Sequence, residues 1–272
     1  MPVFIQLLGG DPNLLAENAH KAYELGAPGI DLNFGCPAKT VNRHDGGATL
    51  LKNPERLFNI ISKIKSVLPD DAVVTSKVRL GFTDKSLCKD IAQASCSAGA
   101  AILTVHARTK LEGYKPPAHW EFIALMKDSV KLPVVANGDI WTVEDYFRCV
   151  EISGCKNIAL GRPAFAKPDL ALQIKAAVNK QIPTPLPYIE IVEKQFLPFG
   201  KMSFDYKDEK FAVNRSKQWS KYLGRTYPEF ESLFQIIKRE KEIATIRQHT
   251  FCLLYTSPSP RDQRGSRMPS SA

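Results

Sequence analysis

Short apolar runs alternate with amphipathic segments over the first 180 residues of the chain. The apolar runs cover residues 3–8, 29–33, 72–78, 101–106, 133–137 and 157–161. Each run is too short for a typical helix and is bounded by turn residues, so each predicts a buried β-strand. Six strands separated by helices predict a parallel sheet with crossover helices.

The segments between the runs carry helix-start signals. Asp11 and Asn53 each precede a proline, which predicts a capping side chain followed by a first-turn proline. Thr142 with Asp145 three residues later is close to a capping box, and a further helix is expected after Asp84. Two apolar stripes at helical spacing support these helices: Leu57, Ile60, Ile61 and Ile64, and Leu87, Ile91, Ala94 and Ala98.

Polar residues close the predicted strands and favour one of two architectures. An open doubly wound sheet and a (β/α)8 barrel both fit the alternation, but the first turn lacks the glycine fingerprint of a dinucleotide-binding sheet. Instead, the strand ends carry Gln6, Asn33, Lys77, Arg79, His106 and Asn137. A ring of polar groups at C-terminal strand ends is how a barrel forms its active site. We therefore predict an α/β fold, a TIM barrel lacking its first two βα units, with Met1 as an internal start or a fragment edge.

Beyond residue 180 the strand pattern gives way to helices. Residues 181–187 are proline-rich and predict a stiff linker between a barrel domain at 1–180 and a small all-helical domain at 188–250. Residues 251–272 are rich in Ser, Pro and Arg, resemble the read-through of a vector or adapter, and predict a disordered, non-native tail. Three stripes define the helices of the second domain: Ile189, Val192 and Phe196; Phe211, Arg215, Trp219 and Tyr222; and Phe230, Leu233, Phe234 and Ile237.

Composition narrows the class of protein. The 272 residues are 44% hydrophobic, which is enough for a sizeable core. They contain no 18-residue apolar run and no signal peptide, so we expect a cytoplasmic protein without a membrane span. Six cysteines without CxxC spacing indicate reduced thiols rather than a disulfide framework or a metal site. A net charge of +9 is compatible with a nucleic-acid partner, although many basic proteins have none.

A lone cysteine, Cys36, follows the second predicted strand between Gly35 and Pro37. A thiol at a strand end can be a nucleophile, an acid or a metal ligand, whereas a cysteine packed in a core is chemically inert. The flanking glycine and proline predict a loop, and this favours the reactive alternative.

Other strand ends offer groups for a phosphate-bearing cofactor. Lys77 could hold an anion or an electron-rich ring, and His106 could donate to a cofactor carbonyl or act as a base, although each could equally be structural. Gly138 and Gly161 follow the last two strands and allow close backbone approach. Arg162 adds a charge there, as in the phosphate sites of barrels.

Five motifs together resemble the tRNA-dihydrouridine synthases, in the order of that family, over roughly residues 3–248. They are Leu32-Asn-Phe-Gly-Cys36-Pro with Gly46-Gly-Ala, Lys77-Val-Arg79-Leu-Gly81, Val105-His106-Ala-Arg108-Thr109, Ala136-Asn137-Gly138-Asp139 and Gly161-Arg162. Asn42, Tyr114, Trp141 and the run Arg215-Ser-Lys217-Gln-Trp219 are most similar to the bacterial subfamily that modifies uridine 16 of tRNA.

The resemblance implies a flavin enzyme. FMN, reduced by NADPH, would pass a hydride to C6 of a uracil base in the tRNA D-loop, while Cys36 protonates C5. An unperturbed thiol, with a pKa of about 8.5, holds its proton at neutral pH and can serve as that acid. The implied partner is tRNA, with no membrane and no obligate protein partner, so we expect a monomer.

The resemblance also implies roles for single residues. The residues implied to bind the cofactor are Gln6, Lys77, His106, Asn137, Gly138, Asp139, Gly161 and Arg162. Those implied to bind the substrate are Asn33, Lys39, Arg79, Arg108, Tyr114, Arg215, Lys217 and Lys221. The basic residues at helical spacing beside Trp219 and Tyr222 could contact RNA phosphates, or could be a solvated helix face.

Two other functions stay open at this point. The family's first strand, with its Ala-Pro-Met turn, and its second strand are absent from this sequence. The chain could therefore be a catalytically impaired tRNA-binding fragment, or an FMN barrel reductase acting on a free pyrimidine.

Overall fold

The computed structural model describes residues 3–256. In its N-terminal part, six parallel strands pair in sequence order, as the apolar runs predicted. Each strand lies within two residues of its predicted bounds, and the prediction of an α/β fold is confirmed. The strands are β1 (Ile5–Leu7), β2 (Ile30–Asn33), β3 (Val74–Arg79), β4 (Ile102–His106), β5 (Val134–Asn137) and β6 (Asn157–Ala159).

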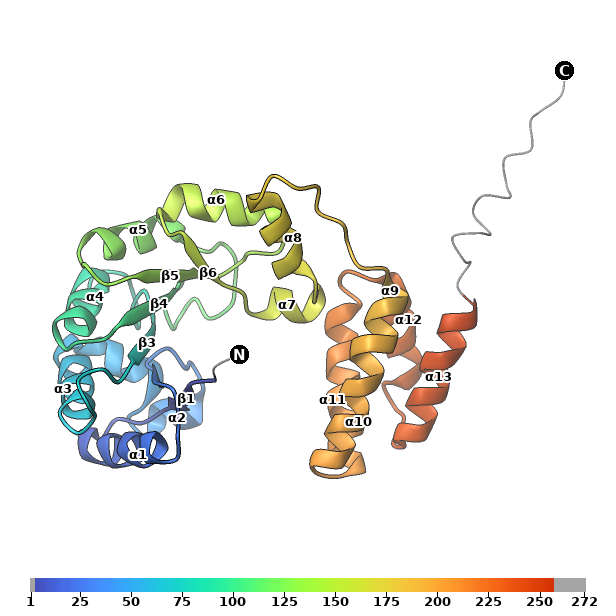
Figure 1. Cartoon of the computed structure of the whole chain (residues 1–272), viewed down its shortest axis with the longest axis horizontal. Helices are drawn as coiled ribbons and strands as arrows, with labels where there is room; N and C mark the ends of the chain where they lie inside the picture. The colour runs from blue at the N-terminus through green and yellow to red at the C-terminus, as the bar shows by residue number, and fades with distance from the viewer. Residues whose placement is uncertain (1–2, 257–272) are drawn as a thin grey trace, which may run out of the picture. The chain divides into compact units, whose positions relative to one another are not determined.

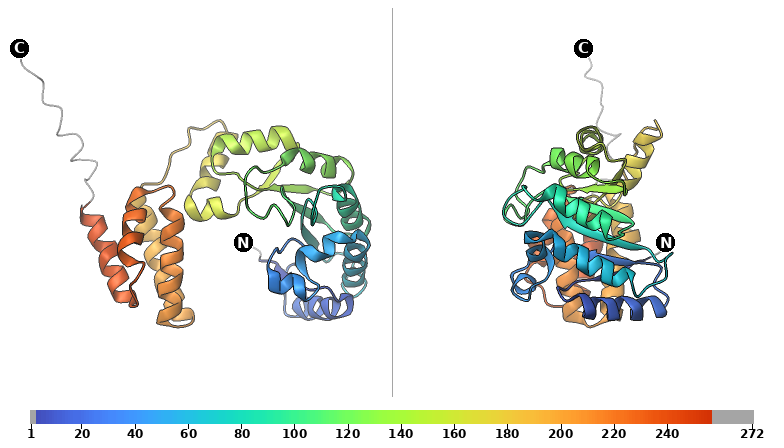
Figure 2. Two further views of the ribbon diagram at one scale, coloured as in Figure 1. Left: turned by 180° about the vertical axis from the view of Figure 1, so that it is seen from behind. Right: turned by 90° about the vertical axis from the view of Figure 1, so that its left-hand side faces the viewer.

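Helices follow one another around the outer side of this sheet (Figure 1), and the views in Figure 2 agree. They are α1 (Pro12–Glu24), α3 (Pro54–Lys65), α4 (Cys88–Ser97), α5 (Trp120–Asp128) and α6 (Val143–Ser153). A short helix α2 (Lys39–Arg43) and a 3-10 turn η1 (Gly47–Lys52) extend the connection after β2. This connection is the segment that follows Cys36.

Capping side chains begin three of these helices as predicted. The side chains of Asp11, Asn53 and Thr142 accept backbone N–H bonds, and Asp145 completes a capping box with Thr142. Each cap satisfies amide groups that have no partner inside the helix. The local sequence therefore decides where α1, α3 and α6 begin.

Helix α4 begins at Cys88, later than the position after Asp84 that the sequence suggested. The Asp84 carboxylate accepts hydrogen bonds from the amide and hydroxyl of Ser86 and closes a turn instead. Gly81 permits this turn, because a Cβ atom there would lie 2.0 Å from the Asp84 carbonyl oxygen. The helix ends before Gly99, which has a φ of +90° as a helix-ending glycine often does.

The core of this unit lies between the sheet and its helices. Alternate strand residues face the helices and are fully or almost fully buried: Ile30, Leu32, Val74, Val78, Leu103, Val105, Val134 and Ala136. They pack with the predicted α3 stripe of Leu57, Ile60, Ile61 and Ile64, which is also buried. The opposite face of the sheet is therefore left for polar side chains.

The chain divides into two compact units between Gly161 and Arg162. The second unit contains α7 (Arg162–Ala166), α8 (Leu170–Val178), α9 (Tyr188–Ile191), the π-helical turn η2 (Val192–Phe196), α10 (Leu197–Tyr206), α11 (Glu209–Leu223), α12 (Pro228–Ile237) and α13 (Ile243–Thr256). Its core is the cluster Ile191, Val192, Phe196, Val213, Leu223, Phe230, Leu233, Ile237 and Ile246. The sequence had predicted a boundary about twenty residues later, at the linker.

A buried carboxylate explains why α8 and the linker belong with the C-terminal helices. Asp169, which is 1% exposed, accepts hydrogen bonds from the Leu186 amide at 2.8 Å and from the Gln173 side chain at 2.6 Å. Burial, reinforced by the charge of Asp169, raises the pKa of Tyr227, the residue before α12, to about 12. Leu186 and Tyr188 pack against the helical core, so the predicted linker is held to that unit.

Two sequence expectations differ at the C-terminal end. Helix α13 extends to Thr256, so the predicted boundary at residue 250 falls inside a helix. The rest of the predicted tail, residues 257–272, lies outside the described residues. In α11 the buried positions are not the predicted stripe of Phe211, Arg215, Trp219 and Tyr222 but Ala212, Val213, Ser216, Ser220 and Leu223.

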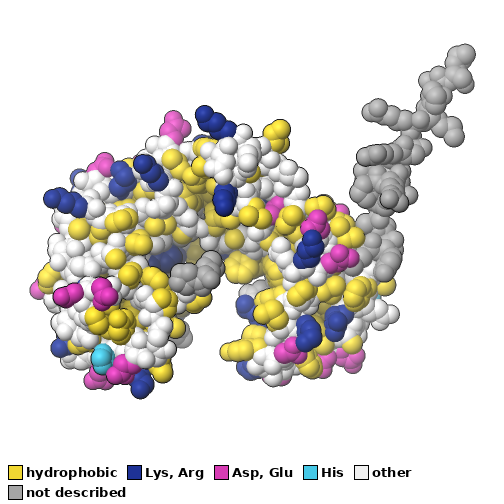
Figure 3. All heavy atoms as spheres, in the orientation of Figure 1, with side chains coloured by type: hydrophobic (Ala, Val, Ile, Leu, Met, Phe, Trp, Pro, Cys, Tyr) yellow, Lys and Arg dark blue, Asp and Glu magenta, His cyan; other side chains and the backbone are white. Residues whose placement is uncertain are grey.

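Charged side chains on the face drawn in Figure 3 are scattered, with Lys and Arg interspersed among Asp and Glu. The net positive charge is therefore not gathered into one patch on that face. Among the described residues, no helix is both long and apolar enough to cross a membrane.

Candidate active site

The strand register places a set of polar side chains on the face of the sheet opposite the helices. In parallel strands, residues paired in register point to the same face. Gln6 is paired with Asp31, Asn33 with Lys77, and His106 with both Arg79 and Asn137. The residues that share this face are Gln6, Asp31, Asn33, Thr75, Lys77, Arg79, Thr104, His106 and Asn137.

Hydrogen bonds link the polar side chains of β1, β2 and β3. The Asn33 amide donates to Gln6 Oε1 at 3.0 Å, and Gln6 Nε2 donates to Asp31 Oδ2 at 2.6 Å. The Thr75 hydroxyl donates to Asp31 Oδ1 at 2.7 Å. These bonds fix the orientation of both amides at the C-terminal ends of the first two strands.

Lys77 provides a cation in the middle of this face. Its ammonium donates to Asn137 Oδ1 at 3.5 Å, and Asn137 in turn donates to the Ala159 carbonyl at 2.8 Å. Burial lowers the pKa of Lys77, the charge of Arg79 lowers it further, and the charge of Asp31 offsets part of the shift. A partly desolvated cation at this position favours an electron-rich or anionic ligand.

Cys36 lies in a loop held by backbone and side-chain bonds at the same end of the sheet. The Gly35 amide donates to Asn33 Oδ1 at 3.1 Å, which turns the chain directly after β2. The Asn42 amide group donates to the Cys36 carbonyl at 2.9 Å. Gly47 has a φ of +61°, and a Cβ atom there would lie 2.8 Å from the Cys36 carbonyl oxygen and 3.0 Å from Cys36 Cβ. The thiol is therefore positioned by contacts that involve only small or amide side chains.

Arg79 joins the Cys36 loop to the loop that follows β4. Its guanidinium donates to the carbonyl oxygens of Gly35 at 2.8 Å, Thr109 at 3.0 Å and Gly113 at 2.8 Å. Arg79 is 2% exposed. All three acceptors are main-chain oxygens, so this arginine holds the two loops together and does not reach solvent.

The loop after β4 carries Tyr114 over the sheet. The Tyr114 ring lies 5.9 Å from the ring of His106, and the Arg79 guanidinium lies 5.2 Å from the Tyr114 centroid. Glu112 anchors the loop: it forms an ion pair with Lys85, accepts the Thr109 amide at 2.6 Å, and lies 3.3 Å from His119 Nε2. Tyr114 itself is 52% exposed.

The turn after β5 is held by a buried ion pair. Gly138 and Asp139 both have positive φ, at +128° and +51°. The Asp139 carboxylate pairs with Arg108, which is fully buried and also donates to the Pro117 carbonyl at 3.1 Å. The Trp120 indole donates to the Gly138 carbonyl at 2.9 Å. The side chains of Arg108 and Asp139 are thus used to shape the turn.

The predicted residues beyond Gly161 lie in the second unit. Arg162 is the first residue of α7, and Arg215, Lys217 and Lys221 lie on α11. Lys217 donates to the Glu240 carbonyl, while Arg215 donates to the Gln218 side chain at 2.7 Å. At helical spacing Lys217 and Lys221 share one face of α11, and Arg215 lies on another.

A family model described as dihydrouridine synthase (Dus) matches residues 1–252. The chain belongs to this family. The tRNA-dihydrouridine(16) synthase of Pseudomonas putida is 49% identical over 246 residues, which are 90% of this chain and 76% of that protein. The tRNA-dihydrouridine(16) synthase of Shewanella oneidensis is 42% identical over 248 residues, 90% of this chain and 77% of that protein. The resemblance seen in the sequence, including that to the uridine-16 enzymes, is confirmed.

Similarity to solved structures is lower. A 2-naphthoyl-CoA reductase in complex with 2-naphthoyl-CoA aligns with a TM-score of 0.48 at 14% identity, over 62% of this chain and 29% of that chain.

This dihydrouridine synthase brings together most of the residues predicted for its N-terminal unit. Gln6, Asn33, Lys77, His106 and Asn137 share one face of the sheet, and Cys36, Tyr114 and Gly138 lie in loops at its C-terminal edge. The predicted substrate contacts of Arg79 and Arg108 need correction, because their burial leaves them no surface for RNA. Lys39 is exposed at the start of α2.

Three residues around the site of this family member were not predicted as site residues. Asn42 holds the Cys36 carbonyl, Gly47 leaves room for it, and Glu112 anchors the Tyr114 loop. Asn42 and the glycine pair Gly46-Gly47 had been noticed only as parts of motifs. Their roles depend on which segments pack together, and local sequence patterns do not contain that information.

Proposed function

We propose that this chain reduces a uridine in the tRNA D-loop, at position 16, to 5,6-dihydrouridine. The family and the relatives named tRNA-dihydrouridine(16) synthase support the reaction and the substrate. The observation that carries the proposal is that the Cys36 loop and the side chains of Lys77 and His106 meet at one edge of the sheet, where Arg79 ties the loop in place. A proton donor and a cofactor site must adjoin for this reaction.

The donor set on the sheet face fits FMN. When bound and reduced by NADPH, FMN would supply the hydride for C6 of the uracil base. Gln6, Lys77 and His106 offer amide, cationic and imidazole groups to a flavin ring, and the lowered pKa of Lys77 reflects a site without full solvent screening. Asn137, Gly138, Asp139, Gly161 and Arg162 stay candidates for the ribityl-phosphate, with Asp139 acting through the shape of its turn.

Cys36 would donate the proton that C5 takes up when the hydride is added to C6. A thiol with an ordinary pKa is protonated at neutral pH and can act as a general acid. The Asn42 and Gly47 contacts fix the loop that carries the thiol, and a fixed donor needs less reorganisation in the transition state. Asn33 would orient the uracil edge, since Gln6 and the Gly35 amide already hold its side chain.

The target base must leave its stack to reach the sheet face. Tyr114, exposed above His106, would pack against the extruded base. Lys39, Arg215, Lys217 and Lys221 would neutralise backbone phosphates, and Arg79 and Arg108 would act by positioning the loops. We propose that the enzyme works on tRNA as a monomer.

The finer architecture belongs to the same proposal. The six βα units would form part of an eight-unit barrel, with the edges of β1 and β6 joined by two further units. The parallel order of all six strands and the polar groups at their C-terminal ends support this.

The test is the Cys36→Ala variant, with Cys96→Ala as the control because both thiols are partly buried. With FMN, NADPH and tRNA, Cys36→Ala should form dihydrouridine about 100-fold or more slowly, the usual effect of losing a general acid. Binding of tRNA should stay unchanged.

If Cys36→Ala forms as much dihydrouridine as the wild type, Cys36 is not the general acid. If the wild type binds tRNA but forms no product, the chain is better described as an RNA-binding protein without catalytic activity. Inhibition of product formation by free uracil compounds would favour a reductase of free pyrimidines.

A further inference from the structure

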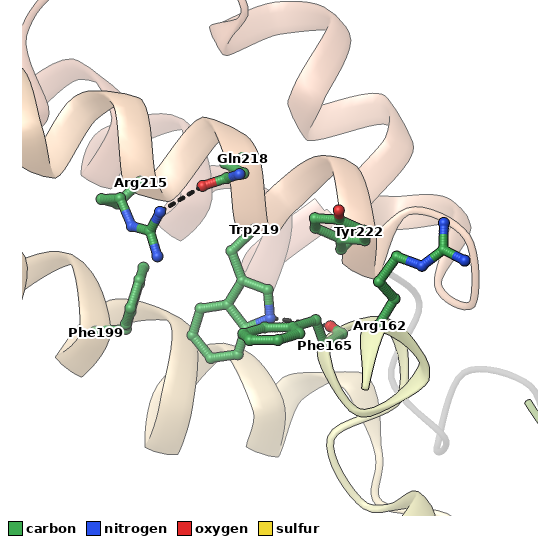
Figure 4. A pocket seen from close by; sticks show the side chains of 7 residues that line it. All are labelled: Arg162, Phe165, Phe199, Arg215, Gln218, Trp219 and Tyr222. Carbon is green, nitrogen blue, oxygen red and sulfur yellow. Dashed lines mark hydrogen bonds between the residues drawn. The ribbon is translucent and has the colours of Figure 1, made fainter. Parts of the chain in front are cut away.

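A recess lies within the helical unit. It has a volume of about 240 Å³ and is lined by residues of α7, α10 and α11. The lining residues are Arg162, Phe165, Phe199, Arg215, Gln218, Trp219 and Tyr222 (Figure 4). We call it the aromatic pocket.

Three of the α11 residues that line the aromatic pocket, Arg215, Trp219 and Tyr222, belong to the stripe predicted from the sequence. Trp219 and Tyr222 are only partly buried, and Arg215 is exposed, because α11 turns a different set of residues to the core. With Phe165, which is 55% exposed, they present aromatic surface beside a guanidinium on this side of α11. Trp219 also packs on Phe196 of the helical core, whereas Arg215 is exposed and is not part of that core.

Contacts at its edges hold the Trp219 ring in one orientation. The indole N–H donates to the Phe165 carbonyl at 3.0 Å, and the Phe199 ring meets the indole edge-on, 4.8 Å away. The rings of Phe165 and Tyr222 are 6.0 Å apart and tilted by 38°, so they contact each other and leave no room for a ring between them. A planar ligand would stack on this aromatic wall.

The polar groups of the aromatic pocket select an anionic, planar ligand. Among its described lining residues none carries a carboxylate, and Arg215 supplies a guanidinium that the proposed cofactor site does not use. Figure 4 shows Arg215 with Gln218 on one side of Trp219, and Arg162 with Tyr222 on the other. One guanidinium N–H of Arg215 is used by Gln218, and the fork has further donors for a phosphate.

From this arrangement we propose that the aromatic pocket binds one unstacked nucleotide of the RNA substrate, other than the nucleotide that is reduced. Its base stacks on the wall of Trp219, Phe165 and Tyr222, and Arg215 contacts its phosphate. The pocket is smaller than the roughly 300–1,000 Å³ of sites for drug-sized ligands, which suits a single base and not a dinucleotide cofactor. The inference rests on the proposed function, because it assumes that tRNA is the substrate.

The test compares Phe165→Leu and Arg215→Gln with two controls outside the pocket. Phe165 is 55% exposed and its carbonyl bond to Trp219 survives the substitution, so the fold is not at risk. The controls are Phe204→Leu, also an exposed aromatic, and Arg247→Gln, an exposed arginine on α13. Affinity for tRNA is measured for all four full-length variants over a range of salt concentrations.

The two pocket variants should fail in different ways. Phe165→Leu should weaken tRNA binding about 5- to 10-fold, the low end for one base–aromatic stack, without changing the salt dependence. Arg215→Gln should lower the slope of log affinity against log salt by about 0.7 to 0.9, the value for one phosphate contact. The controls should match the wild type. For Phe165→Leu, turnover at saturating tRNA should stay unchanged, while KM rises.

The outcomes separate the pocket from the function as a whole. If Phe165→Leu binds tRNA as the wild type does, the pocket proposal is wrong and the proposed function is unaffected. If Phe165→Leu loses turnover at saturating tRNA, the residue acts on the reduced base and the proposal of a second nucleotide is wrong. If the wild type binds no tRNA, both proposals fail together.

Discussion

Gly47 fits beside Cys36 in the candidate active site because it has no side chain. Its positive φ and its closeness to Cys36 exclude a Cβ atom for two separate reasons, backbone strain and collision. The neighbouring Asn42 contributes through an amide that meets the Cys36 carbonyl. At the scale of single residues, the position of the thiol is set by its neighbours' shapes more than by charge.

Gly47→Ala should lower dihydrouridine formation by about 10-fold or more, because the Cβ atom would displace the Cys36 carbonyl. Gly26→Ala is the matched control: Gly26 also has a positive φ, at +89°, but no atom lies within 4 Å of an added Cβ. Both variants should lose about 1 kcal/mol of unfolding free energy from strain. Equal turnover of the two variants would show that the close approach to Cys36 does not matter.

Lys77→Met should raise the free energy of unfolding at pH 7 by about 1 kcal/mol and abolish flavin retention. The charged lysine is poorly solvated in the folded chain, and methionine removes that cost. Because the pKa of Lys77 is lowered, the unfolded chain holds this proton up to about pH 10.5 while the folded chain releases it earlier. Wild-type stability should therefore rise with pH across that interval, relative to Lys77→Met.

Denaturant unfolding between pH 7 and 10.5, with flavin absorbance, measures both effects. Lys63→Met, on the exposed face of α3, is the control and should change neither. If the Lys77→Met chain is less stable than the wild type at pH 7, the attraction of Asp31 outweighs the cost of burying the Lys77 charge.

At the scale of elements, the strands were predictable and the loops were not. The strands β2 to β5 bury alternate apolar residues against the helices, and their polar ends mark where the candidate site begins. The sequence does not predict the conformation of the loop after β4, because Glu112 contacts Lys85 and His119 only in the folded chain. Cys36 could be predicted as a site residue because a glycine and a proline flank it in the sequence. Asn42 could not, because its contact with Cys36 forms only in the folded chain.

Glu112→Gln should destabilise the loop that carries Tyr114. Burial raises the pKa of the Glu112 carboxyl, but the bonds from Lys85 and the Thr109 amide, with the charge of His119, outweigh burial and lower it. The lowered pKa means that the carboxylate stabilises the fold above about pH 4.5 and loses this effect as the pH falls through the folded-state value. At pH 7 the loss should be about 1 kcal/mol, with a raised KM for tRNA.

Chemical unfolding at pH 7 and at pH 3 checks this. The two proteins should differ at the higher pH and converge at the lower one. Glu121→Gln, which removes a more exposed carboxylate from the same segment and from the same histidine, is the control and should have little effect. A constant difference at both pH values would rule out the charge as the cause.

At the scale of the whole molecule, the sequence located the change from strands to helices but not the division between units. The proline-rich residues 181–187 were predicted to be a domain boundary. Composition indicates how stiff a segment is, but it does not indicate which unit the segment packs against. Asp169 attaches that segment to the helical unit through the Leu186 amide, a contact across 17 residues. The division accordingly falls between Gly161 and Arg162.

Asp169→Ala should make residues 179–187 more accessible to protease, because the Leu186 amide loses its buried acceptor. Limited proteolysis followed by mass spectrometry would locate the cut, and the cleavage rate should rise several-fold. Asp205→Ala, which removes an exposed carboxylate paired with Lys201 on α10, is the control. Unchanged cleavage in Asp169→Ala would mean that packing of Leu186 and Tyr188 alone holds the segment.

The partners of Arg79 have a consequence for redesign. Its three carbonyl acceptors are main-chain oxygens, which every amino acid provides, so these bonds do not depend on loop side chains, whereas its contact with the Tyr114 ring does. Residues at the loop tips can be exchanged, to recognise a different base, while the scaffold that aligns them is kept. The residues at the loop tips can therefore vary while the Arg79 bonds beneath them stay the same.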